Sequence, residues 1–286
     1  MAAAFFVLLS CIVAGTGAGP VVLEEPPFEY TLAAEPEERI SLRVVDSSAA
    51  GVTDLEDWFA EISYPALTFH GGGINDAIRG SSVPRPVPES ISVDGEGLCL
   101  YQLMYASDMA VASYGLPPNR FCVVLDPRVL VGLAPDGSGP AWVLDFSSYL
   151  YAPGDDPDGG ALPQAVRWAE VHDGVLYVSN YHRTYATNTG GRNAYVTAIR
   201  LADMELLWRS RPLVCNSHNF LLTEGSIICG YGFTDESDFL YLLDRETGEV
   251  YDSVAVQSAP EYLAVLGSYL YVRCYDAEYV FEMVEE

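Results

Sequence analysis

Short apolar segments that open on a glycine turn recur along the second half of the chain. Three begin alike, at Asp173–Val178, Glu224–Cys229 and Leu266–Tyr271, and an earlier candidate lies at Gly95–Tyr101. Each is an apolar run without strict alternation, which is the pattern of a strand buried on both faces. Their spacing of about 40 to 50 residues indicates a repeat in which each sheet stacks on its neighbours.

A β-hairpin pattern follows two of these openings. The first consists of Tyr195–Leu201, a turn at 202–204 and Leu206–Trp208. The second consists of Phe239–Asp244, a turn at 245–249 and Val250–Val256, and the two align without a gap. The repeat therefore predicts an all-β fold built from successive four-stranded sheets.

One of these hairpins carries a family resemblance. In Leu240–Val256 (LYLLDRETGEVYDSVAV) a strand ends in Asp244, the chain turns through Thr247 and Gly248, and a second strand returns. This segment resembles the outer hairpin of quinoprotein-like and WD40-like β-propeller repeats, and Leu176–Asn180 resembles a strand of surface-protein propeller repeats. The resemblance covers about residues 90 to 286 and implies the fold alone. Quinoprotein dehydrogenase activity is not expected, because the chain is short for that ring and lacks a vicinal cysteine pair.

The expected architecture is a β-propeller of about five blades, with four to six compatible with 286 residues. The last repeat has strands at 270–272 and 279–284 and then no room for a fourth, which would leave an open edge. We predict that Ile40–Val45 pairs with this sheet and closes the ring. The propeller domain is expected at 39–286, with one short helix at Thr53–Ile62.

The N-terminal residues resemble an export signal. Met1–Ser10 is a short apolar run, and small residues follow as far as Gly19, so residues 1–19 are expected to be a signal peptide and 20–38 a linker. Two cleavage alternatives stay open. Leu8–Cys11 resembles a lipobox that would lipidate Cys11, and ordinary cleavage would fall near Ala18 or Gly19. The protein is accordingly expected in the periplasm, anchored to the outer membrane, or outside the cell.

Charge limits the classes of partner. Fourteen basic residues, all arginine, stand against 40 acidic ones, giving a formal net charge of −26. Such a polyanion does not neutralise phosphates, so we expect no nucleic-acid partner and no membrane contact except through a lipid anchor. The absence of lysine also excludes Schiff-base and P-loop chemistry.

The cysteines fit an exported protein. If Cys11 is lipidated or removed, an odd number remains, so one or two disulfides and a free thiol would follow. The alternative is that cysteines within apolar strands, such as Cys229, are small buried hydrophobic residues.

Polar residues after two repeats form the candidate binding site. Tyr181, His182 and Arg183 follow the predicted inner strand of one blade, and Asn216 and His218 precede the opening strand of the next. Neighbouring blades would bring them to one mouth of the channel, where Arg183 would hold a carboxylate in a fork. The alternative is that they satisfy turn backbones.

No metal or cofactor motif is evident in the sequence. Asp155, Asp156 and Asp158 resemble a calcium loop but lack its full pattern, so a solvated acidic turn is the preferred interpretation and no cofactor is expected. No nucleophile elbow, phosphate loop or histidine pair with metal-ligand spacing occurs.

The first functional hypothesis is an exported, non-catalytic binding or scaffold propeller whose partner is a protein or a small polar ligand. Two alternatives are a small hydrolase or lyase that uses His182 and His218, with no catalytic residue assigned, and a structural subunit of a surface assembly.

Overall fold

The computed structural model describes most of the C-terminal half and several strands of the N-terminal half. The described residues are 21–28, 40–49, 90–93, 96–99, 102–106, 120–125, 128–133 and 140–285. Within them the elements are β-strands, apart from two 3-10 helices, η1 (Ser147–Tyr149) and η2 (Ala186–Thr189). The fold is therefore all-β, as predicted, whereas the expected helix at 53–62 and Cys11 lie outside the described residues.

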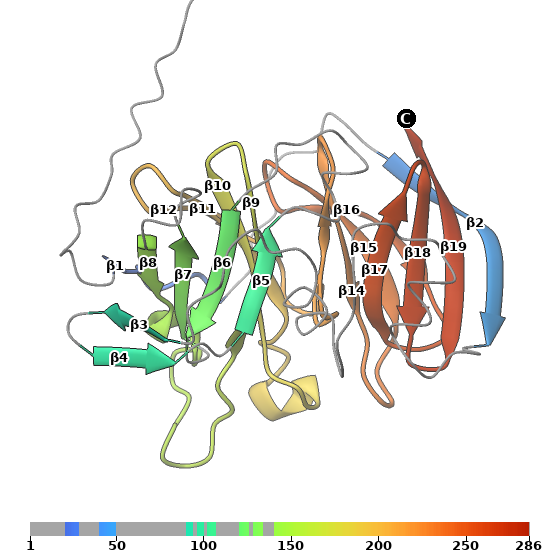
Figure 1. The fold of residues 1–286 in the computed structure, drawn as a ribbon. Helices are drawn as coiled ribbons and strands as arrows, with labels where there is room; N and C mark the ends of the chain where they lie inside the picture. Colours follow the sequence, from blue (N-terminus) through green and yellow to red (C-terminus); the bar gives the residue numbers. More distant parts are fainter. Residues whose placement is uncertain are drawn as a thin grey trace, which may run out of the picture.

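Four sheets follow one another along the chain (Figure 1). Their strands are as follows. Sheet I has β5 (Gln102–Ala106), β6 (Arg120–Leu125), β7 (Val129–Leu133), β8 (Pro140–Asp145) and β1 (Val21–Val22). Sheet II has β9 (Ala165–His172), β10 (Val175–Tyr181), β11 (Tyr195–Arg200) and β12 (Glu205–Arg209). Sheet III has β13 (Leu221–Leu222), β14 (Ser226–Tyr231), β15 (Phe239–Asp244) and β16 (Val250–Ala255). Sheet IV has β17 (Pro260–Leu266), β18 (Tyr269–Cys274), β19 (Ala277–Glu285) and β2 (Ile40–Ala49). A separate hairpin joins β3 (Ser90–Val93) to β4 (Glu96–Cys99).

The sheets pack face to face around a continuous hydrophobic core. Buried residues of all four belong to one cluster, in which Leu144, Leu176, Ile228 and Leu270 have no exposed surface. Contacts between β5 and β9, and between β14 and β17, join neighbouring sheets. Every residue of β14 is buried, as expected of a strand with a sheet on either side.

The glycine-led segments are correctly predicted as strands, but their position in the sheets differs from the prediction. Each is the second strand of its sheet, because β9, β13 and β17 precede β10, β14 and β18 and pair with them. Gly174 and Gly267 lie in the tight turns between these strands at φ of 77° and 63°, where a glycine carries no steric penalty. The strand before His182, β10, is thus a central strand of sheet II with a paired strand on each side.

The hairpin of sheet III explains the Asp-Thr-Gly pattern. Asp244 Oδ1 accepts hydrogen bonds from the backbone N–H (2.7 Å) and the hydroxyl (2.6 Å) of Thr247. Gly248 adopts φ of 75° and its N–H donates to the Asp244 carbonyl (2.8 Å). The Asp-Thr-Gly pattern therefore fixes a turn that passes close to the neighbouring sheet.

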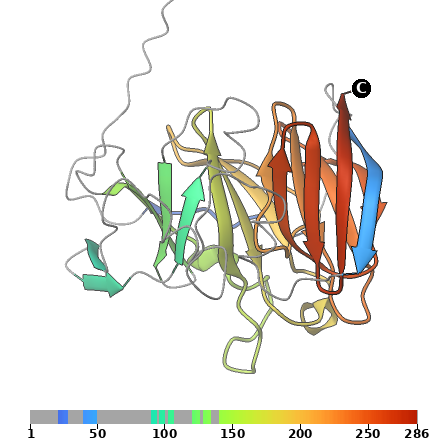
Figure 2. The same ribbon diagram turned by 45° about the vertical axis from the view of Figure 1, so that its right-hand side comes forward.

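The N-terminal strand β2 is found where the sequence places it, along β19 (Figure 2). The pairing is antiparallel and runs from Ala49 opposite Ala277 to Ile40 opposite Glu285. An ion pair between Arg43 and Glu282 joins the two strands. Sheet IV thus gains its fourth strand from a segment far away in the sequence.

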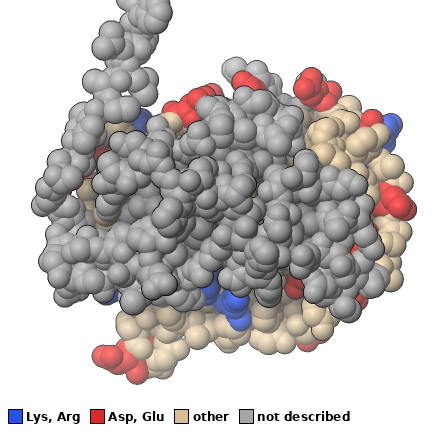
Figure 3. Space-filling view, in the orientation of Figure 1, with Lys and Arg blue, Asp and Glu red and all other residues tan. Residues whose placement is uncertain are grey.

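On the face shown in Figure 3, acidic side chains are visible at several places on the described surface and arginines at fewer, in line with the acidic composition. Among the described residues, no helix has the length and apolar character needed to cross a bilayer.

Candidate functional site

The candidate site lies where the ends of sheets II, III and IV approach one another. Arg183 follows β10, His218 precedes β13, and Tyr262 lies on β17. The His218 N–H donates to the carbonyl of Glu261 (2.8 Å), so the backbone of sheet IV fixes the position of this loop. Residues from three sheets thereby meet at one place.

His218 is held as a neutral ring. Its imidazole stacks on Tyr262, with ring centroids 4.6 Å apart and planes 15° from parallel. Burial, together with the positive charges of Arg183 and Arg167, lowers the pKa of His218 to about 4. At neutral pH the ring is therefore uncharged and offers one N–H donor.

Arg183 sets the tautomer of that ring. Its Nη2 lies 3.5 Å from His218 Nδ1. A guanidinium can only donate, so Nδ1 is the acceptor and the proton lies on Nε2. The Arg183 side chain is exposed and makes no salt bridge with a carboxylate in the described part of the chain.

Tyr181 forms the floor of this site. It is buried, its hydroxyl donates to the carbonyl of Ser217 (3.3 Å), and its own carbonyl accepts from Arg167 Nε (3.4 Å). The Arg167 guanidinium lies 5.5 Å from the Tyr181 ring centroid, within cation–π range. Two arginines and a histidine N–H therefore converge in a protein that is otherwise strongly acidic.

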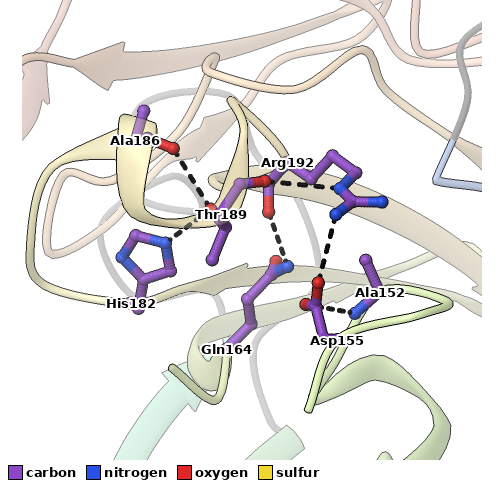
Figure 4. Close-up of polar contacts among 7 residues, drawn as sticks. All are labelled: Ala152, Asp155, Gln164, His182, Ala186, Thr189 and Arg192. Atoms are coloured by element: carbon purple, nitrogen blue, oxygen red, sulfur yellow. Dashed lines mark hydrogen bonds and ion pairs between the residues drawn. The ribbon is translucent and has the colours of Figure 1, made fainter. Parts of the chain in front are cut away.

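The His182 ring points toward Thr189 within its own loop (Figure 4). Its Nε2 lies 2.9 Å from Thr189 Oγ1, and its backbone is clamped by the amide of Asn193. The side chain is 4% exposed, and burial lowers its pKa. The described contacts therefore do not present His182 and His218 to a common ligand.

The Asn216 side chain, like that of His182, makes hydrogen bonds within the protein. Its Nδ2 donates to the Gly232 carbonyl (2.8 Å) and its Oδ1 accepts from the Gly232 N–H (3.1 Å). Of the five predicted residues, contacts bring Tyr181, Arg183 and His218 together. The His182 ring instead contacts Thr189, and Asn216 holds the Gly232 backbone.

The acidic turn at 155–158 makes protein contacts. Asp155 accepts from the Ala152 N–H and pairs with Arg192 (3.1 Å), and Asp156 accepts from the Asp158 N–H (3.1 Å). No cluster of three metal-ligating side chains occurs in the described residues. Calcium binding stays a prediction without support from this geometry.

Three cysteines of the described region are free thiols. Cys215, Cys229 and Cys274 are all buried, and burial raises the pKa of Cys274 to about 12. These three follow the alternative in which cysteines serve as small core residues.

Comparison with known proteins gives no family. No protein-family model matches the chain, and no curated protein matches it either. Solved structures that share part of the fold include BamB from Moraxella catarrhalis, with 14% identity, a TM-score of 0.34 and coverage of 66% of this chain and 65% of that one.

Two further solved structures are of propeller proteins. The WD40 β-propeller domain of Doa1 shares 12% identity at a TM-score of 0.39, with 68% of this chain and 57% of that one covered. The quinohemoprotein alcohol dehydrogenase ADHIIG from Pseudomonas putida HK5 shares 9% identity at a TM-score of 0.38, with coverage of 66% and 40%. This chain therefore spans less than two thirds of the length of each.

Two residues of the site were missed in the sequence. Arg167 lies on β9 and Tyr262 on β17, the strands that were not predicted. The sequence Pro260-Glu261-Tyr262 lies at the start of β17. Proline and an acidic residue are both unfavourable in a central strand, so the pattern there did not predict one.

Proposed function

We propose that this protein is an exported, non-catalytic binding propeller of about five blades, closed by the pairing of β2 with β19. Its binding site is the cluster of Arg183, His218 and Tyr262, and its ligand presents a carboxylate on a protein or a small polar molecule. The observation that carries the proposal is the exposed Arg183 guanidinium, held 3.5 Å from His218 Nδ1 and without a salt bridge to a described carboxylate. A planar fork of N–H groups fits a carboxylate in two hydrogen bonds.

Electrostatics set the conditions for binding. The net charge of −26 repels anions at long range, but the Debye length is about 8 Å at 0.15 M salt. Distant carboxylates are then screened, while the adjacent Arg183 and Arg167 still act. Small or locally exposed carboxylates are therefore favoured over long polyanions.

The test is calorimetric titration with succinate, glucuronate and N-acetylated dipeptides at 0.15 M ionic strength. We expect saturable binding of at least one of them, weakened at least tenfold in Arg183→Gln. Arg200→Gln is the matched control, because Arg200 is also half exposed but forms ion pairs with Asp203 and Glu205 on sheet II.

Two results would overturn the proposal. One is the absence of saturable binding for every compound, and the other is equal binding by wild type and Arg183→Gln. Export is tested separately, by mass spectrometry of the mature N-terminus from the native source. That measurement distinguishes a lipidated Cys11 from cleavage near Ala18.

A further inference from the structure

A second arginine, remote in its contacts from the candidate site, is buried without a counter-ion among the described residues. Arg209, the last residue of β12, is 6% exposed, and burial lowers its pKa to about 10. No described carboxylate forms a salt bridge with it, although the chain has 40 acidic residues. A buried cation is normally paired, because leaving water costs several kcal/mol.

Aromatic rings enclose this guanidinium. Its central carbon lies 3.8 Å from the ring centroid of Tyr195, 4.6 Å from Phe28 and 5.3 Å from Tyr149. Phe28 belongs to the segment 21–28, which we call the strap. The strap attaches to sheet I through the pairing of β1 with β8. Arg209 therefore lies between sheet II and the strap.

The hydrogen bonds of Arg209 are incomplete. Nη1 makes a long contact with the Pro27 carbonyl (3.4 Å), whereas Nε and Nη2 have no hydrogen-bond partner in the described structure. Cation–π contacts stabilise the charge, but they leave these two in-plane N–H groups unused. Two donors of a buried charge are thus available to a ligand.

More unused polar groups share the face of sheet II on which Arg209 lies. Thr197 is directly opposite Arg209 in the pairing of β11 with β12, and Asn180 is opposite Tyr195 in the pairing of β10 with β11. Cross-strand partners lie on the same face of a sheet. Thr197 and Asn180 have no exposed surface, and the Thr197 hydroxyl and both amide atoms of Asn180 lack hydrogen-bond partners.

The opposite wall adds a further donor. The hydroxyl of Tyr149, from η1, is buried without a partner, and burial raises the pKa of Tyr149 to about 12, so the hydroxyl keeps its proton. Folded proteins leave few buried polar atoms unsatisfied, so a group of such atoms on one face is a candidate binding site. Here the donors include an uncompensated positive charge, so an anion fits better than water alone.

A recess adjoins this region. It has a volume of about 430 Å³ and is lined by Pro26, Pro27, Phe28, Pro153 and Arg192. Arg192 already pairs with Asp155 (Figure 4), so its charge is compensated. Pro27 and Phe28 line the recess and also contact Arg209, so the recess lies next to the residues of the strap that cover the guanidinium.

We propose that the buried polar face of sheet II, at Arg209, Thr197, Asn180 and Tyr149, binds a small anion that fastens the strap to the sheet. The anion accepts hydrogen bonds from Arg209 Nε and Nη2 and neutralises the guanidinium. Its charge takes the place of the carboxylate that no described residue supplies at this position. Because the site lies between the strap and sheet II, occupancy couples the N-terminal segment to the fold.

The experiment uses bromide as the probe. Thermal unfolding is measured in sodium bromide and in sodium gluconate, whose anion is too large for a buried site, at equal ionic strength. We expect a saturable rise of the midpoint temperature with bromide in the wild type. Arg209→Met should lose this rise and, in gluconate, be at least as stable as the wild type, because it removes an unpaired buried charge. Arg200→Met, on the same sheet but exposed, should keep the bromide response.

Two further measurements keep the proposal testable if Arg209→Met does not fold. Thr197→Val keeps the charge of Arg209 and removes one hydrogen-bond donor. We expect it to weaken the affinity for bromide about three- to tenfold. Anomalous scattering from bromide-soaked crystals should place a peak within hydrogen-bond distance of Arg209. A wild type without a saturable bromide effect, or crystals without this peak, would overturn the proposal. Arg183 is untouched throughout, so the outcome is independent of the proposed carboxylate site.

Discussion

At the scale of single residues, Glu170 shows how a buried ionisable group affects stability. Glu170 lies on β9, is 3% exposed, and accepts one hydrogen bond from the indole of Trp168 (2.9 Å). Burial raises its pKa to about 8, while the hydrogen bond acts in the opposite direction. The folded protein therefore holds this carboxyl group protonated at neutral pH.

The pH dependence follows from that shift. The folded pKa is above the unfolded one, so the contribution to stability is complete below about pH 4.5 and is lost as the pH rises through 8. We predict that Glu170→Gln removes this dependence, and that the wild type loses about 1 kcal/mol relative to the variant between pH 7 and 9. Urea unfolding at each pH measures the difference. Glu25→Gln, at an exposed position, should track the wild type, and parallel curves for wild type and Glu170→Gln would contradict the prediction.

At the scale of elements, the turn between β15 and β16 connects sheet III to sheet II. Gly248, in the turn between β15 and β16, lies against Trp208 of β12, and the Trp208 indole donates to the carbonyl of Arg245 (3.2 Å). A Cβ at Gly248 would lie 2.3 Å from Trp208 Cε3. The turn of sheet III thus requires glycine both for φ and for its approach to sheet II.

We predict that Gly248→Ala destabilises the protein by about 2–4 kcal/mol, through positive φ together with overlap with the Trp208 ring. Gly267→Ala is the control. Gly267 also has a positive φ, but a Cβ there would meet nothing within 4 Å, so only about 1–2 kcal/mol of backbone strain is expected. Chemical denaturation compares the two, and equal losses would show that the contact between sheets II and III is unimportant.

Some strands were predictable from the sequence and others were not. The hairpins of sheets II and III were located correctly, because a turn between two strongly apolar runs is a local signal. Strands β9 and β17 were missed. They are the first strands of their sheets and carry Arg167, Glu170 and Glu261, which interrupt the apolar pattern.

The candidate site was predictable only in part for the same reason. Arg183 and His218 lie in loops, where polar residues are conspicuous, whereas Tyr262 and Arg167 lie on the missed strands. His182 resembles a site residue in the sequence, but in the structure its ring forms a hydrogen bond with the Thr189 hydroxyl. Partners so far apart in the chain are set by the packing of sheets, which a local pattern does not contain.

At the scale of the whole molecule, the charge of −26 opposes compaction. We predict that the midpoint of thermal unfolding rises as sodium gluconate increases from 0.05 to about 0.5 M, because the Debye length falls well below 10 Å. Differential scanning calorimetry measures this rise. Choline gluconate should give the same rise if screening is the cause, and an effect of sodium alone would indicate cation binding instead.

Sheet IV joins β2 to β19, and residues such as Arg43 and Glu282 that meet in it are 239 positions apart. The entropy of closing so long a loop grows only slowly with its length, but the order of events during synthesis is fixed. When β2 leaves the ribosome its partner does not yet exist, and sheet IV stays incomplete until β19 has been made. Under the proposed export, this delay keeps the chain from closing its fold before translocation, when it must still be threaded as an open polypeptide.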